Sequence, residues 1–150
     1  SPYQIVVSGK SEVIDQLLIL GEEEEEINIV PLKVSAPFHS SLMRKAKENL
    51  ASYIENVNIQ KPKIPVICNV TADYVKTKEE IKNALIEQVT HPIKWVDIIK
   101  KMNSEGVNYF IEVGPGNVLN KLIKQILPKA KVYNVCDSES LEKVIRRLNK

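Results

Sequence analysis

The chain has 150 residues, of which 43% are hydrophobic and 27% are charged, and its formal net charge is +2. This balance is typical of a globular chain of about one domain and excludes collagen-like and low-complexity classes. No apolar stretch approaches the ~20 residues of a membrane-spanning helix, and no signal peptide is visible at the start, so no membrane association is expected.

The beginning of the chain predicts a strand–helix–strand unit. Short β-branched sequence over residues 3–9 predicts the first strand. Apolar residues then recur at helical spacing, and Ser11 is placed as the N-cap of that helix. Residues 27–34 predict a second strand, bent or at an edge because Pro31 interrupts it. The five consecutive glutamates Glu22–Glu26 predict a solvated loop.

Helices and strands alternate along the rest of the chain. Helices are predicted over residues 42–55, 78–88, 95–103, 117–127 and 140–148, and strands over residues 66–70, 107–113 and 131–135. Thr77 is the predicted cap of the second of these helices. Because strands that alternate with helices pair in parallel, the pattern predicts a layered α/β architecture.

The two cysteines, Cys68 and Cys136, are far apart and form no Cys-x-x-Cys pair. They are interpreted as half-buried thiols of a reducing compartment, which favours the cytoplasm. The alternative, Cys68 as a nucleophile beside a histidine, has no spacing to support it. Two histidines without a Cys or acid at ligand spacing make a poor zinc site, so no metal is expected.

Charge is unevenly distributed. Residues 1–30 hold seven acidic side chains and one basic one, whereas residues 31–150 hold twelve acidic and twenty basic ones. The basic remainder suits an acidic partner. Nucleic acid would fit that sign, but no recognition motif or basic block with interleaved aromatics occurs, so it is not expected.

His39 is the first candidate for chemistry. It lies in a loop after a predicted strand, where α/β proteins place catalytic groups, although a lone loop histidine is more often a surface residue. His91 precedes Pro92 where a predicted helix stops and is interpreted as structural. Ser40 cannot easily pair with the adjacent His39, because neighbouring side chains in extended structure point apart. The chain has no G-x-S-x-G elbow, Walker A motif or G-x-G-x-x-G motif.

Gly114-Pro115-Gly116 is the second candidate, because it follows a predicted strand and opens a predicted helix. Free N–H groups at that helix start could bind an anion. The structural interpretation, tight strand–helix packing with special glycine backbone angles, is favoured because the phosphate-binding lysine is absent.

Five segments occur in a specific order over nearly the whole chain. They are Ser1–Gly9 (SPYQIVVSG), Val34–Met43 (VSAPFHSSLM), Asn69–Ala72 (NVTA), Gln88–Trp95 (QVTHPIKW) and Glu112–Leu119 (EVGPGNVL). Their order and spacing resemble the C-terminal half of the malonyl-CoA:acyl carrier protein transacylase family. The family's oxyanion loop, serine elbow and carboxylate-binding arginine would all precede Ser1.

The resemblance implies an α/β fold: the C-terminal half of an α/β-hydrolase-like acyltransferase domain plus half of an inserted ferredoxin-like subdomain. Residues 1–34 would be the second half of the small subdomain, and residues 35–150 the C-terminal part of the large one. Apolar surface is then expected to be exposed where the other half would pack.

The resemblance also implies a function, the transfer of a malonyl group from malonyl-CoA to the phosphopantetheine thiol of acyl carrier protein in fatty acid biosynthesis. His39 would be the base for a serine that this chain lacks, and imidazole suits the task because it titrates near neutral pH. The main-chain carbonyl of Gln88 would orient His39. Phe38 would contact substrate and favour malonyl over methylmalonyl groups. No metal or organic cofactor is implied.

Two alternatives stay open at this point. The chain could be a non-catalytic fragment or a docking module for a carrier protein, because a base without its nucleophile cannot sustain covalent transfer. It could also belong to the acyltransferase domain of a polyketide synthase, which shares the motif around His39.

Overall fold

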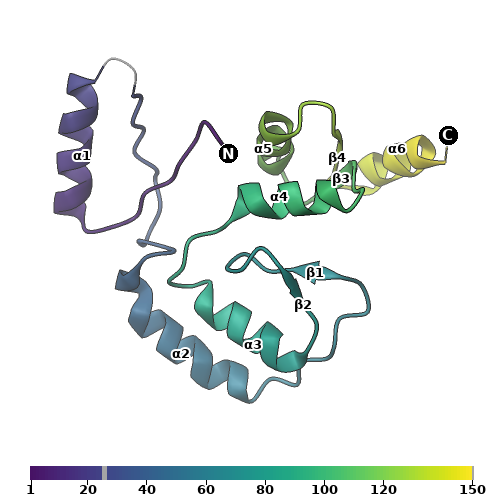
Figure 1. Cartoon of the computed structure of the whole chain (residues 1–150), viewed down its shortest axis with the longest axis horizontal. Coiled ribbons are helices and arrows are strands. Elements are labelled where there is room, and N and C mark those ends of the chain that lie inside the picture. The colour runs from purple at the N-terminus through teal and green to yellow at the C-terminus, as the bar shows by residue number, and fades with distance from the viewer. Residues whose placement is uncertain (25–26, 150) are drawn as a thin grey trace. The chain divides into compact units, whose positions relative to one another are not determined.

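A computed structural model describes residues 1–24 and 27–149. The chain divides into two compact units, one formed by Val6–Lys94 and the other by Ser1–Ile5 with Trp95–Lys150. Helices and strands occur in both (Figure 1), which confirms the predicted mixed α/β composition. The hydrolase-like and ferredoxin-like assignments, and the subdomain boundary after residue 34, stay predictions.

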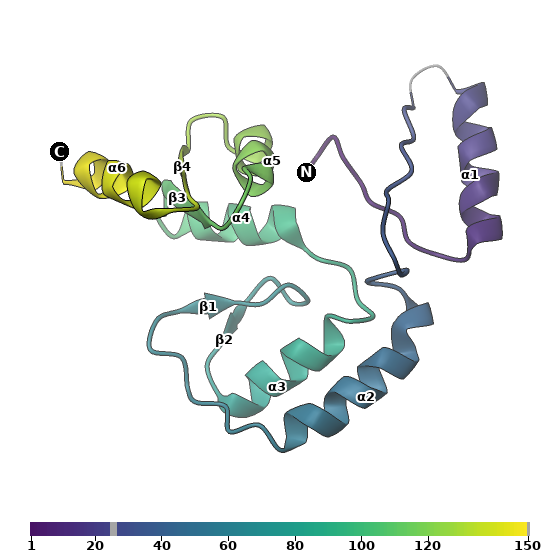
Figure 2. The same cartoon turned by 180° about the vertical axis from the view of Figure 1, so that it is seen from behind.

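The unit Val6–Lys94 combines helices with one short hairpin. Its elements are α1 (Ser11–Glu23), the 3-10 turn η1 (Ser41–Met43), α2 (Arg44–Glu55), β1 (Val66–Ile67), β2 (Tyr74–Val75) and α3 (Lys78–Glu87). Strands β1 and β2 are antiparallel, with Val66 opposite Val75. Seen from behind (Figure 2), α2 and α3 lie side by side and the hairpin lies next to α3.

Local chemistry fixes the start and the packing of α3. The Thr77 side chain accepts a hydrogen bond from the Glu80 N–H, and the Glu80 carboxylate accepts one from the Thr77 N–H. Together the two bonds form a capping box. The predicted cap is therefore confirmed. Lys47 of α2 donates to Glu87 of α3 at 2.7 Å, and this half-buried pair ties the two helices together. Helix α3 thus ends at a defined place, immediately before Gln88.

The other unit contains a strand–helix–strand arrangement. Its elements are α4 (Trp95–Ser104), β3 (Tyr109–Val113), α5 (Val118–Ile126), β4 (Lys131–Val135) and α6 (Ser138–Leu148). Strands β3 and β4 are parallel, with Tyr109 opposite Lys131, as the alternation of elements predicts. Ile99, Phe110, Ile123 and Ala130 form the buried core of this unit.

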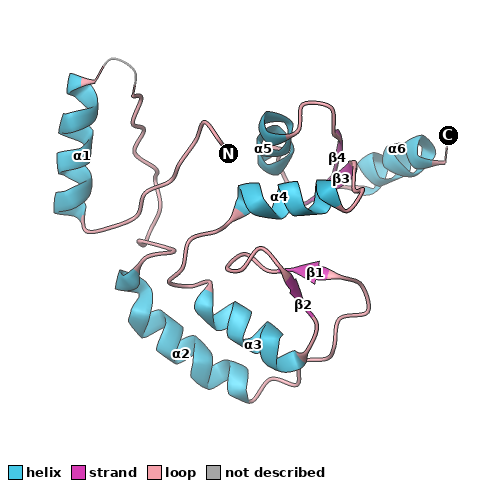
Figure 3. Cartoon of the chain, in the orientation of Figure 1, coloured by secondary structure: helices cyan, strands magenta, loops and turns pink. Residues whose placement is uncertain are grey.

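The strands predicted over 3–9 and 27–34 are wrong. Within the described residues both segments are loop (Figure 3), and their apolar side chains are exposed, with Tyr3 at 85% and Val30 at 65%. A β-strand needs a partner to receive its N–H and C=O groups, and neither segment has one here. Apolar surface is therefore exposed on these segments, and its burial by another half of the protein stays a prediction.

Other expectations need smaller corrections. Lys10, not Ser11, stands at the N-cap of α1, and no side chain caps it. Glu22 and Glu23 end α1 rather than lie in a loop, and Glu25 and Glu26 lie outside the described residues. The sequence did not predict the short strand β2. Because β1 pairs with β2, it is part of an antiparallel hairpin instead of a parallel sheet.

The cysteines are both free thiols, Cys68 half-buried and Cys136 exposed, so the expected half-burial is wrong for Cys136. Among the helices of the described residues, none combines the length and the apolar character that a membrane crossing requires.

Candidate active site

His39 lies in a tight turn between the loop over residues 27–34 and η1. Its φ is +61°, a left-handed conformation that non-glycine residues rarely adopt. Ser40 builds the turn: its hydroxyl donates to the Pro37 carbonyl at 2.7 Å and accepts from the Leu42 N–H at 3.3 Å. Ser40 therefore serves the backbone, in agreement with the expectation that it does not pair with His39.

The imidazole of His39 is held by main-chain carbonyls. Its Nδ1 lies 2.8 Å from the carbonyl oxygen of Gln88 and 3.2 Å from that of His91. A carbonyl oxygen can only accept, so Nδ1 carries the proton and donates it. In this tautomer the neutral ring has its lone pair on Nε2, and no hydrogen bond occupies Nε2 within residues 1–24 and 27–149. The exposed His39 ring is thus oriented with one nitrogen open.

Gln88 is the C-cap of α3, so the helix itself brings its carbonyl to the end of the element. The chain then turns through His91 and Pro92. The His91 ring contacts the Glu87 carbonyl oxygen at 2.8 Å and the Glu87 carboxylate at 3.3 Å. This local contact agrees with the interpretation of His91 as structural. The structure therefore brings together His39 and the carbonyl of Gln88, the two residues predicted as base and orienting group; their roles stay predictions.

Phe38 directly precedes His39, and its side chain is 48% exposed. Its N–H donates to the Ala36 carbonyl at 2.9 Å, which tightens the turn before His39. The aromatic ring is therefore accessible beside the candidate base, and its predicted contact with substrate stays a prediction.

A residue that the sequence did not single out individually also contacts the site. The Asn69 side chain donates through Nδ2 to Oε1 of Gln88 at 3.1 Å. Asn69 begins one of the five segments of the resemblance, but its spacing from Gln88 carries no signal of contact. Only the hairpin between β1 and β2, which the sequence did not predict, brings it there.

The Gly114-Pro115-Gly116 loop leads into a helix whose first turn already has a bound carboxylate. Glu112 at the end of β3 accepts from the Leu119 N–H at 3.1 Å and from the Asn120 N–H at 3.0 Å. A carboxylate of the chain itself thus occupies the first turn of α5, where an anion would bind. Gly114 and Gly116 have φ values of +138° and +86°. Both observations favour the structural interpretation of this loop.

Cys68 does not form the alternative Cys–His pair. Its Sγ lies 2.9 Å from the Thr71 hydroxyl, and no hydrogen bond to a histidine is found in the described part of the chain. Burial raises the pKa of the Cys68 thiol, but hydrogen bonds from Thr71, Val70 and Asp73 outweigh it and lower the pKa below its usual value.

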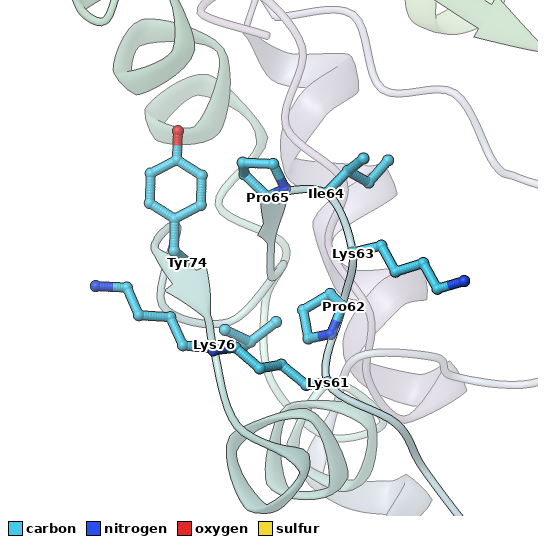
Figure 4. A pocket seen from close by; sticks show the side chains of 8 residues that line it. Lys61, Pro62, Lys63, Ile64, Pro65, Tyr74 and Lys76 are labelled. Atoms are coloured by element: carbon cyan, nitrogen blue, oxygen red, sulfur yellow. The ribbon is translucent and has the colours of Figure 1, made fainter.

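Two hollows open on the unit Val6–Lys94. One of about 400 Å³ (Figure 4) is lined by Lys61, Pro62, Lys63, Ile64, Pro65, Tyr74, Val75 and Lys76. The other, of about 200 Å³, lies between the hairpin and α3 and is lined in part by Asn69 and Gln88. The first includes none of the candidate site residues. Across residues 1–24 and 27–149, no cluster of His, Cys, Asp and Glu side chains could hold a metal ion.

The geometry defines a candidate acid–base site, in which a carbonyl holds one nitrogen of a histidine on a mixed α/β scaffold. No family model matches the chain. Malonyl CoA-acyl carrier protein transacylase of Bacillus subtilis is 40% identical over 147 residues, which are 98% of this chain and 46% of that protein. The chain therefore spans about half the length of the curated relatives it matches.

Solved structures agree with this relationship. The malonyl CoA-acyl carrier protein transacylase from Coxiella burnetii is 35% identical with a TM-score of 0.87, over 93% of this chain and 44% of that one. A malonyl-transacylase in complex with a type II polyketide acyl carrier protein is 29% identical with a TM-score of 0.87, over 93% and 45%. The chain is homologous to the C-terminal half of the malonyl-CoA:acyl carrier protein transacylases.

Proposed function

We propose that this chain supplies the general base of a malonyl transfer from malonyl-CoA to the phosphopantetheine thiol of acyl carrier protein. The nucleophilic serine would come from sequence N-terminal to this chain, as the resemblance implies. The observation that carries the proposal is the 2.8 Å contact between Nδ1 of His39 and the Gln88 carbonyl, which leaves Nε2 as the acceptor. The names of the homologues support the substrate pair.

His39 would act twice in each half-reaction. Nε2 removes the serine proton as the serine oxygen bonds to the thioester carbon, and a tetrahedral intermediate forms. When the carbon–sulfur bond breaks, the imidazolium returns the proton to the departing CoA thiolate. The carrier thiol then gives its proton to Nε2, attacks the malonyl-enzyme ester and releases the serine by the same route in reverse.

The Gln88 carbonyl suits this task because it fixes the tautomer without adding a full charge. A carboxylate at the same place would stabilise the imidazolium more strongly, but it would also repel the malonate carboxylate. Phe38, exposed next to His39, would fill the room that the extra methyl of a methylmalonyl group needs. Discrimination of that kind is worth about 1–3 kcal/mol.

An acidic carrier protein is the proposed partner. The excess of basic side chains after residue 30 supports it, and one homologous structure is described as a complex with an acyl carrier protein. The proposed compartment is the cytoplasm, because both cysteines are free thiols. The mechanism uses no metal or organic cofactor. The synthesis served could be that of fatty acids or of polyketides.

The experiment uses the full-length protein and the variant His39→Asn. Asparagine tolerates positive φ, and its side-chain amide can still donate toward the Gln88 carbonyl, but it offers no base in place of Nε2. We expect the single-turnover rate of enzyme malonylation to fall by at least ~10²-fold with little change in melting temperature. Asn58→Leu, on the exposed surface of the same unit and outside the site, is the control and should keep the rate. An unchanged malonylation rate in His39→Asn would contradict the proposed role.

A further inference from the structure

We propose that Asn69 is a positioning residue for His39, acting through Gln88. The inference rests on the proposed function, because it concerns the orientation of the same base. Asn69 lies on a separate element, the hairpin between β1 and β2. Its side chain contacts Gln88 and not the reacting atoms.

Asn69 is hydrogen-bonded to the chain on both sides of the turn between Gln88 and Lys94. Its side chain donates to Oε1 of Gln88 at 3.1 Å, and its main-chain carbonyl accepts from the Lys94 N–H at 2.9 Å. Between these two residues the chain turns through His91 and Pro92. The carbonyls of Gln88 and His91 that contact Nδ1 of His39 are therefore both in the segment whose ends Asn69 ties down.

This turn needs a hydrogen bond from another element to fix it, because α3 ends at Glu87. Beyond Glu87 the backbone continues as turn. The Thr90 N–H donates to the Glu87 carbonyl at an ordinary 3.2 Å, but the Val89 N–H reaches the Ile86 carbonyl only at 3.4 Å. The Val89 N–H and the Gln88 carbonyl belong to one peptide plane, and a bond of 3.4 Å restrains that plane weakly. The direction of the Gln88 carbonyl is thus set partly by what holds the Gln88 side chain.

The residue that does the holding is itself well fixed. The Cys68 N–H donates to the Asp73 carbonyl at 3.0 Å, and the Ala72 N–H donates to the Cys68 carbonyl at 3.1 Å, which closes the hairpin loop around Asn69. Ala72 is buried at 8% exposure with a φ of +57°. A buried non-glycine residue in this conformation persists only where its surroundings determine it. Asn69 is therefore presented from a constrained loop, and it is half-buried with Gln88.

The chain offers a way to separate this role from the carbonyl itself. A substitution of Gln88 leaves the main-chain carbonyl in place and removes only the side chain that Asn69 holds. Asn69→Leu and Gln88→Met therefore break the same hydrogen bond from its two ends at nearly constant volume. In Asn69→Asp the Gln88 amide can turn and donate Nε2–H to the carboxylate, so this variant should restore the tie.

We expect Asn69→Leu and Gln88→Met each to lower the kcat of the full-length protein about tenfold with little change in KM for malonyl-CoA. The loss is smaller than the ~10²-fold or more expected for His39→Asn, because misplacement weakens a base without removing it. The double variant should lose no more than either single one, because both remove one interaction. Asn69→Asp should keep most of the rate.

The matched control is another Asn–Gln side-chain pair in the same unit. Gln60 donates to Asn58 at 3.1 Å on the exposed surface, so Asn58→Leu should leave kcat unchanged. The decisive measurement is ¹⁵N NMR of the His39 ring, which reports which ring nitrogen carries the proton. Misorientation of the Gln88 carbonyl should allow the Nε2–H tautomer to appear in Asn69→Leu and in Gln88→Met. In the control Asn58→Leu, His39 should keep the Nδ1–H tautomer.

The outcomes separate the two proposals. If His39→Asn abolishes malonylation while Asn69→Leu and Gln88→Met keep both kcat and the Nδ1–H tautomer, the positioning role of Asn69 is overturned. If His39→Asn itself keeps malonylation, the proposed function fails. Should Asn69→Leu not fold, Gln88→Met and Asn69→Asp make the same test, because a loss in the first and its absence in the second support the tie.

Discussion

The loop around His39 and the loop from Gly114 to Gly116 both qualify as candidate sites in the sequence, and both contain residues with positive φ. They differ in what they leave unused. In the glycine loop, the two N–H groups of Leu119 and Asn120 are taken by the carboxylate of Glu112. In the histidine loop, carbonyls bind Nδ1, and among the described residues no hydrogen bond reaches Nε2.

This difference separates a loop with a purely structural role from a loop that presents a candidate catalytic group. Glycine adopts positive φ without cost, so Gly114 and Gly116 are sufficient for a turn. A histidine at φ +61° has an energetic cost on the order of 1–3 kcal/mol. The combination of local strain with an open ring nitrogen is what marks the His39 loop as the candidate for chemistry.

The largest effect on the glycine loop should follow from Glu112→Ala. The half-buried carboxylate would no longer accept from the two N–H groups that begin α5, one of them on the buried residue Asn120. We expect the free energy of unfolding to fall by about 2 kcal/mol, the range for hydrogen bonds to charged groups. Chemical denaturation of the full-length protein would measure it.

The same variant tests whether the Glu112 carboxylate is what closes the start of α5 to anions. With the carboxylate gone, the freed N–H groups should bind an anion, so phosphate should raise the melting temperature of Glu112→Ala more than that of the wild type. Glu139→Ala is the control, since the interaction found for Glu139 in the described part of the chain is an exposed pair with Lys143, and it should change stability by less than ~0.5 kcal/mol. Equal stability of Glu112→Ala and wild type would show that the glycine loop does not depend on its carboxylate.

A smaller loss is expected from Gly116→Ala. A Cβ at this position would meet no heavy atom within 4 Å among the described residues, so the cost comes from the φ of +86° alone. Left-handed backbone costs an L-residue about 1–2 kcal/mol. Denaturation midpoints would show it. Gly9→Ala is the matched control: among the described residues its Cβ would meet Ile14 alone, at 4.0 Å, and its φ lies outside the left-handed region. Similar midpoints for both variants would contradict the role of backbone conformation.

Local sequence chemistry predicted the elements whose partners are within the chain. The strand over residues 131–135 formed with its predicted bounds, because β3 lies beside it as a parallel partner. Residues 3–9 and 27–34 have equally good β-branched patterns but no partner strand, so they stay loop in the described part of the chain. Periodicity reports which side chains favour extended backbone, whereas hydrogen-bond pairing decides whether a strand forms.

The site was predictable only in part for a related reason. The contact of His39 with Gln88 follows from resemblance to a family and from no spacing rule, because 49 residues separate them. Asn69 carried no signal, since its approach to Gln88 depends on a hairpin whose second strand, Tyr74–Val75, is too short to leave a pattern. Side-chain contacts between elements need the tertiary structure that the elements build.

The smallest effect is expected at the start of α6, a second helix whose first turn is bound by a carboxylate. Asp137 accepts from the Ser140 N–H at 2.8 Å and from the Ser140 hydroxyl at 2.7 Å at the start of α6. The backbone and hydroxyl hydrogen bonds from Ser140 lower the pKa of Asp137 below its usual value. The charged form is therefore favoured in the folded state, and its contribution to stability is present above the unfolded pKa near 4.

As the pH falls through the unfolded pKa and then the lower folded one, this contribution is lost. Asp137→Asn keeps a capping side chain without the titration, so its melting temperature should lie slightly below that of the wild type at pH 7. The difference should begin to shrink at about pH 4 and vanish only below the lower pKa of the folded state. Melting curves from pH 7 to pH 2 test this, with Glu139→Gln on the same helix as the control. A difference that does not change with pH would mean that the shape of the cap, and not the charge of Asp137, stabilises the start of α6.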